Sequence, residues 1–444
     1  MDLSTLDNAI GERILEGVLP HGLKLVMNPR AGFSRSFGML ATHYGSLDSR
    51  VPDGQGGGLA AVPDGIAHFL EHKLFEDRDG DVSLRFSSRG ASCNAGTEFG
   101  KTAYHFSCAD RLEENLETLI RFVYDPWFTP ESVAKEQGII AQEIRMYDDD
   151  PDWVVFFNLL ELLYHSHPVR INIAGTVESI RRITPELLFR CHRAFYHPRN
   201  MVLAVAGGFD ETRAAAVAER VMGELAFAPG TPWRRPRADE PAAIARKRHV
   251  QPFSVARPQL ALGFKDGDLP TTPDDWLVRD LTTKLLLDVL FSASSRHHEK
   301  LYAADLIDDT FDAAYSGEHD FGFTILGGET DDPDRLAAAL HETLATARRE
   351  GIDAADFELA RNRFLGRWVR AFNSAESLAG ALVSGHFRGV RIDALPQVAM
   401  RLTPGDLARR LESHLREECS ALSILTPDGA RAVDAADGDD DDAG

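Results

Sequence analysis

Two histidines one helical turn apart are the residues of this sequence best suited to chemistry. His68 and His72 lie in the segment GIAHFLEHKLFED, which has the character of a helix over residues 65–75. Residues four apart in a helix share a face, so the two imidazoles could ligate one zinc ion. Glu71 could then act as the base for an activated water. The order His-x-x-Glu-His is the reverse of the common His-Glu-x-x-His motif.

A catalytic zinc ion usually takes three protein ligands, and we expect the third on a second helix over residues 131–147. Glu136 and Glu143 are two turns apart on that helix and fall along its apolar stripe. An isolated carboxylate on a burying face is costly, and contact with a metal or a metal ligand removes that cost. We therefore expect Glu143 to be the third ligand and Glu136 to be a supporting catalytic acid that orients the site.

Both assignments have plain alternatives. The His-x-x-Glu-His pattern arises occasionally by chance in a chain with 16 histidines and 69 acidic residues. Glu136 and Glu143 could instead lie at the edge of the apolar stripe and reach water. The two patterns support each other, because a zinc site built on two histidines needs a third ligand.

The segments around these residues predict strands and helices in mixed order. Strand-like runs at 13–19, 24–28 and 37–44 precede the histidine helix, and residues 91–108 alternate between apolar and polar. Residues 201–206 have the composition of a buried strand. Because no regular alternation of strand and helix is present, we expect an α+β fold rather than a doubly wound parallel sheet.

A proline-rich segment divides the chain into two similar lengths. Residues 227–253 hold five of the 22 prolines and predict an extended linker between domains at 1–226 and 254–430. The last residues, 431–444, predict a disordered acidic tail. The helical stretch at 130–147 matches the stretch at 354–371 at an offset of 224, and the Asp-Arg-Leu triplets at 110 and 334 share that offset. This pattern favours a duplication, although two amphipathic helices can also match by chance.

Composition narrows the class of protein. In the 444 residues, 48 Lys and Arg stand against 69 Asp and Glu, and this net charge of −21 argues against binding to nucleic acid or an anionic membrane. The first 20 residues contain no apolar run typical of a signal peptide, and no apolar window is long enough to span a bilayer. We expect a cytoplasmic protein whose four scattered cysteines are reduced thiols.

Three linked motifs resemble the pitrilysin/insulinase family of zinc metallopeptidases, the inverted zincins, and in particular their bacterial processing-peptidase-like members. The motifs are GIAHFLEHKLFED, CNAGTEFGKTAYHF and KEQGIIAQEIRMYDDDPDW, in that order, with Glu143 placed 71 residues after His72. The later runs HPVRINIAGTVESI and FYHPRNMVLAVAG resemble the same members. The resemblance covers residues 65–208 well and the second half only in general character.

The resemblance implies a zinc-dependent endopeptidase with one zinc ion per chain. It implies two homologous halves, each an antiparallel sheet with helices packed on it, which together form half of a clamshell chamber for peptides. A peptide substrate would add as a strand beside Asn94 and Ala95. Asn94 has a plain alternative as a turn residue beside Gly96. Some relatives are non-catalytic, so a structural or peptide-binding subunit of the same fold is the alternative function.

The second half departs from the pattern of the first. At the offset of 224, the four site residues of the first half correspond to Ser292, Ser295, Arg296 and Arg367, which cannot bind zinc in the same way. Active relatives carry an Arg and, seven residues later, a Tyr in this half, where the nearest match here is Tyr302 and Asp309. We therefore expect a dimer, and specifically a heterodimer in which a related subunit supplies the Arg/Tyr pair.

Overall fold

The first half of the chain forms a seven-stranded sheet. The computed structural model describes residues 3–6, 11–52, 58–227 and 235–428. In spatial order, the strands are β1 (Ser4–Leu6), β2 (Ile14–Val18), β3 (Lys24–Pro29), β11 (Met201–Gly207), β4 (Ser36–Thr42), β10 (Thr102–Cys108) and β9 (Ser92–Thr97). All neighbours are antiparallel except β3 and β11, which are parallel. The strand β9, which is part of the predicted alternating segment, lies at one edge of the sheet.

The second half forms a five-stranded sheet with the same topology. In spatial order, its strands are β12 (Arg248–Phe253), β16 (Ser420–Pro427), β13 (Gln259–Lys265), β15 (Gly322–Glu329) and β14 (Asp312–Gly317). This order matches β3, β11, β4, β10 and β9 of the first sheet, and each sheet has its one parallel pair at the same place. The shared topology is what a duplicated α+β unit requires, as the sequence predicted. Each sheet is antiparallel, as expected, apart from this one parallel pair.

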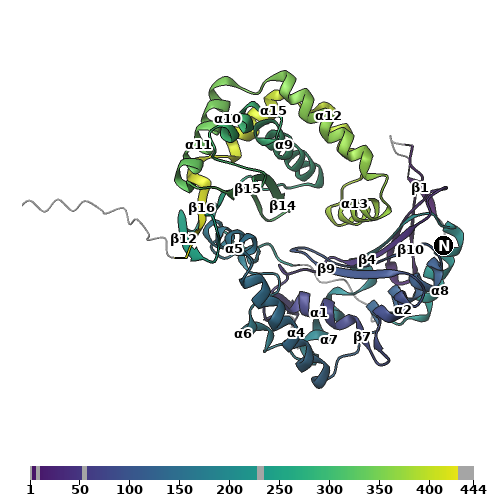
Figure 1. The fold of residues 1–444 in the computed structure, drawn as a ribbon. Helices are drawn as coiled ribbons and strands as arrows, with labels where there is room; N and C mark the ends of the chain where they lie inside the picture. Colours follow the sequence, from purple (N-terminus) through teal and green to yellow (C-terminus); the bar gives the residue numbers. More distant parts are fainter. Residues whose placement is uncertain (1–2, 7–10, 53–57, 228–234, 429–444) are drawn as a thin grey trace, which may run out of the picture.

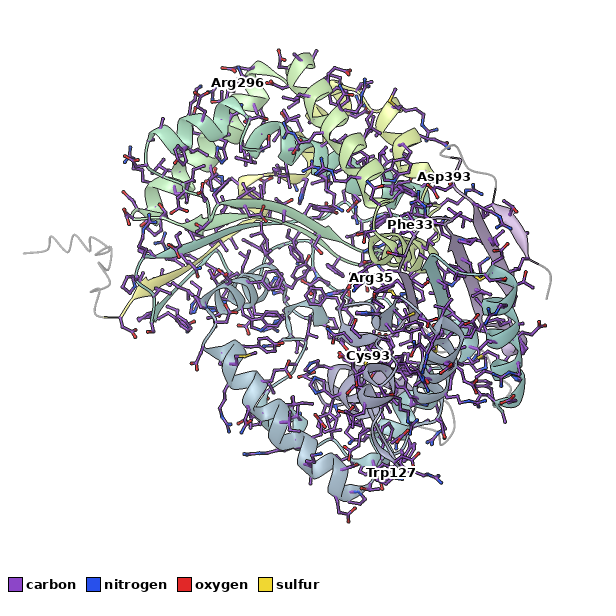
Figure 2. The ribbon with its side chains drawn as sticks, turned by 45° about the vertical axis from the view of Figure 1, so that its right-hand side comes forward. Phe33, Arg35, Cys93, Trp127, Arg296 and Asp393 are labelled. Carbon is purple, nitrogen blue, oxygen red and sulfur yellow. The ribbon has the colours of Figure 1, made fainter. Side chains whose placement is uncertain are left out.

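Helices of each half cover one face of the half's own sheet. Those of the first half are α1 (Ile66–Leu74), α2 (Ser83–Ser87), α3 (Leu112–Tyr124), α4 (Pro130–Asp148), α6 (Val177–Ile180), α7 (Pro185–Phe195) and α8 (Glu211–Glu224). Those of the second half are α9 (Pro273–Phe291), α10 (Arg296–Ala303), α11 (Pro333–Glu350), α12 (Ala354–Ala371), α14 (Ala394–Arg401) and α15 (Pro404–His414). Figure 2 shows Arg296 of the second half and Trp127 of the first at opposite ends of the molecule.

Two further helices are exchanged between the halves (Figure 1). The helix α5 (Pro151–Leu163) comes from the first half but packs on β13 and β16 of the second sheet, whereas α13 (Ala375–Arg388) packs on β4 and β11 of the first. Both faces of β11 are therefore covered, and all seven of its residues are buried. The helices α4 and α12, and likewise α5 and α13, begin 224 residues apart, so the predicted offset holds for both pairs.

The offset is not constant along the chain, and this corrects one predicted correspondence. The strands β9 and β14 begin 220 residues apart rather than 224. Ser292 follows the last residue of α9 and Ser295 is the N-cap of α10, so neither lies within a helix equivalent to α1. Loops and helices of different length between the matched strands account for the change.

The predicted linker also ends earlier than expected. Residues 235–247 contain no helix or strand, but Arg248–Phe253 is β12, which pairs with β16. Pro252 is compatible with this strand because β12 lies at the edge of the sheet, where a missing N–H is tolerated. The predicted acidic tail at 431–444 lies outside the described residues. The four cysteines are free, and no helix in the described ranges has the length and apolar composition needed to cross a membrane.

A buried polar cluster joins the linker to both halves. Arg235 lies between two carboxylates, 3.7 Å from Asp48 of the first half and 3.0 Å from Asp320 of the second. His167, which is fully buried, lies 3.5 Å from the same Asp320. Burial raises the pKa of Asp48 to about 6, although the charge of Arg235 acts in the opposite direction.

The exchanged helix α13 should carry a large share of the stability of the first sheet. Leu378, which is 2% exposed, belongs to an apolar cluster with Val202 and Ala204 of β11. We expect Leu378→Ala to lower the free energy of unfolding by about 2–5 kcal/mol, because it leaves a cavity at this contact. Urea denaturation measures the effect. Met400→Ala, at a 57% exposed position on α14, is the control and should change stability by less than about 0.5 kcal/mol. Equal stabilities of the two variants would contradict the role of α13.

Candidate metal centre

The helix α1 begins where two glycines bring the chain into close contact with itself. Gly65 precedes α1 with φ of 86°, and a Cβ there would lie 2.3 Å from the carbonyl oxygen of Ala174. Gly175, with φ of 73°, is restricted in the same way, because a Cβ at this residue would lie 2.4 Å from the carbonyl oxygen of Asp64. Both positions need glycine, because a side chain would meet backbone. The contact fixes the first turn of α1, and with it His68, against the 173–175 loop.

His68 and His72 present their rings on one face of α1 toward Glu143 of α4. The ring centroids are 4.6 Å apart. Nε2 of His68 lies 3.5 Å from Oε1 of Glu143, and Nε2 of His72 lies 3.5 Å from Oε2 of the same carboxylate. One ligand atom from each of the three residues lies within 4.8 Å of the others. In the described part of the chain, this is the single group of three or more His, Cys, Asp and Glu close enough to share an ion.

These distances suit a tetrahedral zinc ion. Ligand atoms about 2.0–2.2 Å from such an ion lie roughly 3.3–3.6 Å from one another. The distance of 3.5 Å from Nε2 of His72 to Oε2 of Glu143 falls in that range, and Nε2 of His68 lies equally close to the other oxygen of the same carboxylate. Two imidazole nitrogens and one carboxylate also form a donor set that catalytic zinc commonly takes. The three residues therefore fit the metal that the sequence predicted for them.

Glu136 orients the second histidine. Its Oε1 lies 3.1 Å from Nδ1 of His72, and the residue is only 8% exposed. A carboxylate that accepts a hydrogen bond from Nδ1 keeps the ring proton on that nitrogen and leaves Nε2 free to bind a metal. Burial by itself lowers the pKa of His72, but the hydrogen bond that His72 donates to Glu136 and the charges of Glu71, Glu136 and Glu143 outweigh it and raise the pKa. Glu136 thus contacts His72, one of the residues that the sequence predicted as metal ligands.

Glu143 has a second hydrogen-bond partner, Tyr147, one turn further along α4. The Tyr147 hydroxyl donates to Oε1 of Glu143 at 2.8 Å. The hydrogen bond to His68 does most to lower the pKa of Glu143 to about 2, and the Tyr147 hydroxyl contributes to the same effect. Burial and the neighbouring carboxylate of Glu143 raise the pKa of Tyr147 to about 12. The carboxylate is therefore charged, and the phenol keeps its proton at neutral pH.

Glu71 points from α1 toward the edge strand β9. Its Oε2 accepts a hydrogen bond of 2.7 Å from the Thr97 hydroxyl, and the residue is 7% exposed. Thr97, Asn94 and Ala95 line the same cavity, of about 310 Å³, as the two histidines and Glu143. Asn94 lies inside β9 rather than in a turn, and its Oδ1 accepts from the backbone N–H of Ala95 at 2.9 Å. The residues predicted from the sequence as metal ligands, base and substrate contacts therefore line one cavity, whereas Glu136 contacts His72 without lining it.

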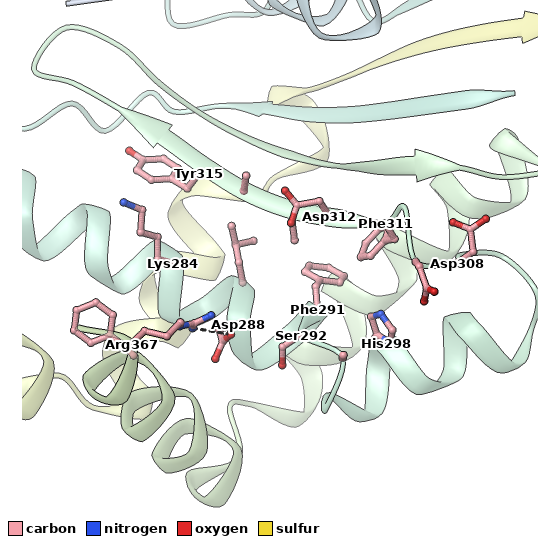
Figure 3. A pocket seen from close by; sticks show the side chains of 16 residues that line it. Lys284, Asp288, Phe291, Ser292, His298, Asp308, Phe311, Asp312, Tyr315 and Arg367 are labelled. Atoms are coloured by element: carbon pink, nitrogen blue, oxygen red, sulfur yellow. Dashed lines mark hydrogen bonds and ion pairs between the residues drawn. The ribbon is translucent and has the colours of Figure 1, made fainter. Parts of the chain in front are cut away.

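The corresponding place in the second half holds an ion pair (Figure 3). Arg367 of α12, which matches Glu143 at the offset of 224, lies 3.2 Å from Asp288 of α9. Arg363 of the same helix lies 3.0 Å from Asp288. Asp288 and Arg367 line a cavity of about 680 Å³, and β14, the counterpart of β9, lines one side of it. An arginine cannot replace a carboxylate ligand, so the two helices are bridged here by charge pairing and not by a metal site of the first kind.

Tyr302 and Asp309, the nearest matches to the Arg/Tyr pair that the resemblance implies, lie outside the cavity of His68 and His72. Tyr302 is on α10, 56% exposed, with its ring parallel to that of His298 at a centroid distance of 6.4 Å. Asp309 lines the cavity of the second half. Neither residue is among those that line the cavity of His68 and His72.

Sequence reasoning missed the hydroxyl groups that hold the carboxylates. Thr97 follows Ala95 by two residues, so strand periodicity places both on the same face of β9. Tyr147 follows Glu143 by four residues on α4, which is the spacing of neighbours on a helix. The ring of Tyr147 also stacks on Trp153 of α5 at a centroid distance of 4.6 Å. Periodicity could have found Thr97 and Tyr147, whereas the contact with Trp153 depends on how α4 and α5 pack.

Comparison with known proteins identifies the family. Residues 56–177 match the family model of insulinase (peptidase family M16), and residues 182–364 match the model of the peptidase M16 inactive domain. The uncharacterized zinc protease YmfH of Bacillus subtilis is 40% identical over 94% of this chain and 97% of its own length. The uncharacterized zinc protease YmxG of the same organism is 25% identical over 82% of this chain and 89% of its own.

Solved structures agree with this family and extend the likeness in fold. The crystal structure described as an M16-like peptidase from Alicyclobacillus acidocaldarius matches with a TM-score of 0.91 at 38% identity, over 96% of this chain and 100% of that chain. Pitrilysin matches with a TM-score of 0.73 at 16% identity, over 96% of this chain but 46% of its own, so the likeness there is one of fold. Because YmfH matches at 40% identity over nearly its whole length, this chain belongs to the insulinase family of peptidases, peptidase family M16.

Proposed function

We propose that this protein is a zinc-dependent endopeptidase that hydrolyses peptides or unfolded protein segments. One observation carries the proposal: His68, His72 and Glu143 converge at ligand distances in a cavity that also holds the buried carboxylate of Glu71. The family supports it, since relatives such as YmfH are named as zinc proteases. In this role, His68, His72 and Glu143 would hold one zinc ion per chain.

Glu71 is the proposed general base. A zinc ion at this site would polarise the scissile carbonyl group and lower the pKa of a water molecule. Glu71 would take the proton of that water and deliver it to the leaving amine. Thr97 holds Oε2 of Glu71 through its 2.7 Å hydrogen bond, so the position of the carboxylate is set before substrate arrives. The orientation of His72 is set in the same way by Glu136.

The edge strand β9 is the proposed binding surface for substrate. It pairs with β10 on one side and has no strand on the other among the described residues. A peptide that adds there as a further strand would lie along Asn94 and Ala95, beside the metal ligands. Binding of this kind relies on main-chain hydrogen bonds and therefore makes few demands on the sequence of the substrate.

A related subunit is the proposed source of groups that this chain lacks. The nearest match in this chain to the Arg and Tyr of active relatives is Tyr302 and Asp309. Neither side chain carries the positive charge that a guanidinium would place beside a substrate carbonyl. We therefore propose that the chain acts in a dimer, and specifically in a heterodimer in which the partner supplies the Arg/Tyr pair.

Glu71→Gln should separate zinc binding from hydrolysis. The variant keeps the three metal ligands but loses the base, so zinc content should match that of the wild type while cleavage of a quenched-fluorescent peptide falls at least about 10²-fold. The tagged chain would be isolated from its source cells so that any partner remains bound, and the assay would be run with and without a chelator. Glu131→Gln, in the exposed first turn of α4, is the control and should keep full activity. Cleavage that survives both the chelator and Glu71→Gln would overturn the proposed function, and a wild type without cleavage would favour the non-catalytic subunit.

The chain purified alone should be far less active than the complex isolated from cells. Each preparation would be tested at equal zinc content with the same peptide, and its mass would be measured by light scattering. We expect adding back the partner fraction to restore activity, because the partner supplies the missing Arg and Tyr. Full activity of the homomeric chain would refute the heterodimer while leaving the zinc peptidase proposal intact.

Thr97→Val should lower turnover without loss of zinc. The substitution keeps the shape of the side chain but removes the donor to Glu71, and a hydrogen bond to a charged group contributes about 1.5–3 kcal/mol. We expect kcat to fall roughly 10- to 100-fold with zinc content unchanged. Thr97→Ser restores the hydroxyl and should recover most of kcat. A serine variant as slow as the valine variant would show that packing at β9, not the hydrogen bond, matters at this position.

A further inference from the structure

The two oxygens of Glu143 have different surroundings. Oε1 accepts the Tyr147 hydroxyl at 2.8 Å and lies 3.5 Å from Nε2 of His68. Oε2 lies 3.5 Å from Nε2 of His72, and no hydroxyl donates to it in the described structure. A carboxylate oxygen that already accepts a strong hydrogen bond is a weaker metal ligand than its free neighbour. The site therefore distinguishes the two oxygens before a metal is bound.

We propose that Tyr147 is a positioning residue of the metal site, which holds Glu143 so that Oε2 is the oxygen presented to the metal. The inference rests on the proposed zinc site but not on peptidase activity. The phenol turns the carboxylate about its last side-chain bond and leaves one oxygen directed toward the two imidazoles. Loss of the hydroxyl would release that rotation, so Glu143 would spend part of its time in orientations that do not suit the ion.

The position of the Tyr147 ring is itself determined by a second helix. The ring stacks on Trp153 with an interplanar angle of 18°, and Trp153 lies in the first turn of α5. Asp150 caps this turn by accepting the backbone N–H groups of Asp152 and Trp153 at 3.0 and 3.4 Å. Further along α5, Leu159 packs against Gly263 of the second sheet. The hydroxyl therefore belongs to a framework that extends from the metal site into the other half of the molecule.

A purely structural role for Tyr147 makes a different prediction from a positioning role. If only the stack on Trp153 mattered, a phenylalanine ring at this position would serve equally well. Tyr147→Phe keeps the ring and removes only the hydroxyl. Tyr124→Phe is the matched control, because Tyr124 is a buried tyrosine of the same half whose hydroxyl has no hydrogen-bond partner among the described residues.

The test measures metal affinity on the full chain without any substrate. Zinc would be titrated against a chromophoric chelator, and we expect Tyr147→Phe to raise the Kd for zinc about 10- to 100-fold, the usual effect of losing a residue that orients a ligand. Tyr124→Phe should leave the Kd unchanged. With cobalt in place of zinc, the visible bands should shift in Tyr147→Phe alone, because they report the geometry of the ligands. The thermal unfolding of both metal-free variants should stay near that of the wild type.

Each outcome bears on one proposal. A zinc Kd and a cobalt spectrum of Tyr147→Phe that match the wild type would overturn the inference, even if the variant is less stable. A shift of similar size in Tyr124→Phe would also overturn it, because the effect would then belong to buried hydroxyls in general. A wild type that binds no zinc would instead refute the proposed function.

Discussion

The constraint on which this structure depends is the gathering of carboxylates around two imidazoles. Glu71 and Glu143 line the cavity of His68 and His72, and Glu136 contacts His72 from outside it, whereas no Lys or Arg of the described residues lines that cavity. Like charges at this separation repel one another, and burial increases the cost. Hydrogen bonds from Thr97 and Tyr147 offset part of it, but a hydroxyl carries no positive charge. A divalent cation is the group that balances such a site.

The same constraint explains why α1, α4 and α5 are held so closely. The helix α4 carries both Glu136 and Glu143, and α1 carries both histidines, so a shift between them of about 1 Å would spoil the ligand set. Glycine contacts fix the start of α1, and the Tyr147–Trp153 stack joins α4 to α5. Since α5 packs on the second sheet, the two halves must assemble before the site has its final geometry.

Features of this arrangement that depend on residues close together in the sequence could be predicted, whereas features that depend on contacts between distant segments could not. Local periodicity identified α1, α4, the strands around them and the pairs His68/His72 and Glu136/Glu143, because spacing of four and seven on a helix already implies a shared face. Asn94 and Ala95 came instead from the resemblance to the family. Exchange of α5 and α13 could not be predicted, since an apolar stripe shows that a helix is buried but not which sheet covers it. The start of β12 was missed because prolines near an edge strand resemble those of a linker.

The duplicated half shows how the same helix pairing persists without a metal. At matched positions of α4 and α12, Glu143 faces two histidines, whereas Arg367 faces Asp288. Each arrangement balances its own charges, and a mixture would not: an arginine opposite the histidines would repel the metal, and a glutamate opposite Asp288 would repel that carboxylate. A single substitution therefore cannot convert one kind of site into the other. The two halves can keep one topology while only one of them retains a set of residues that fits zinc.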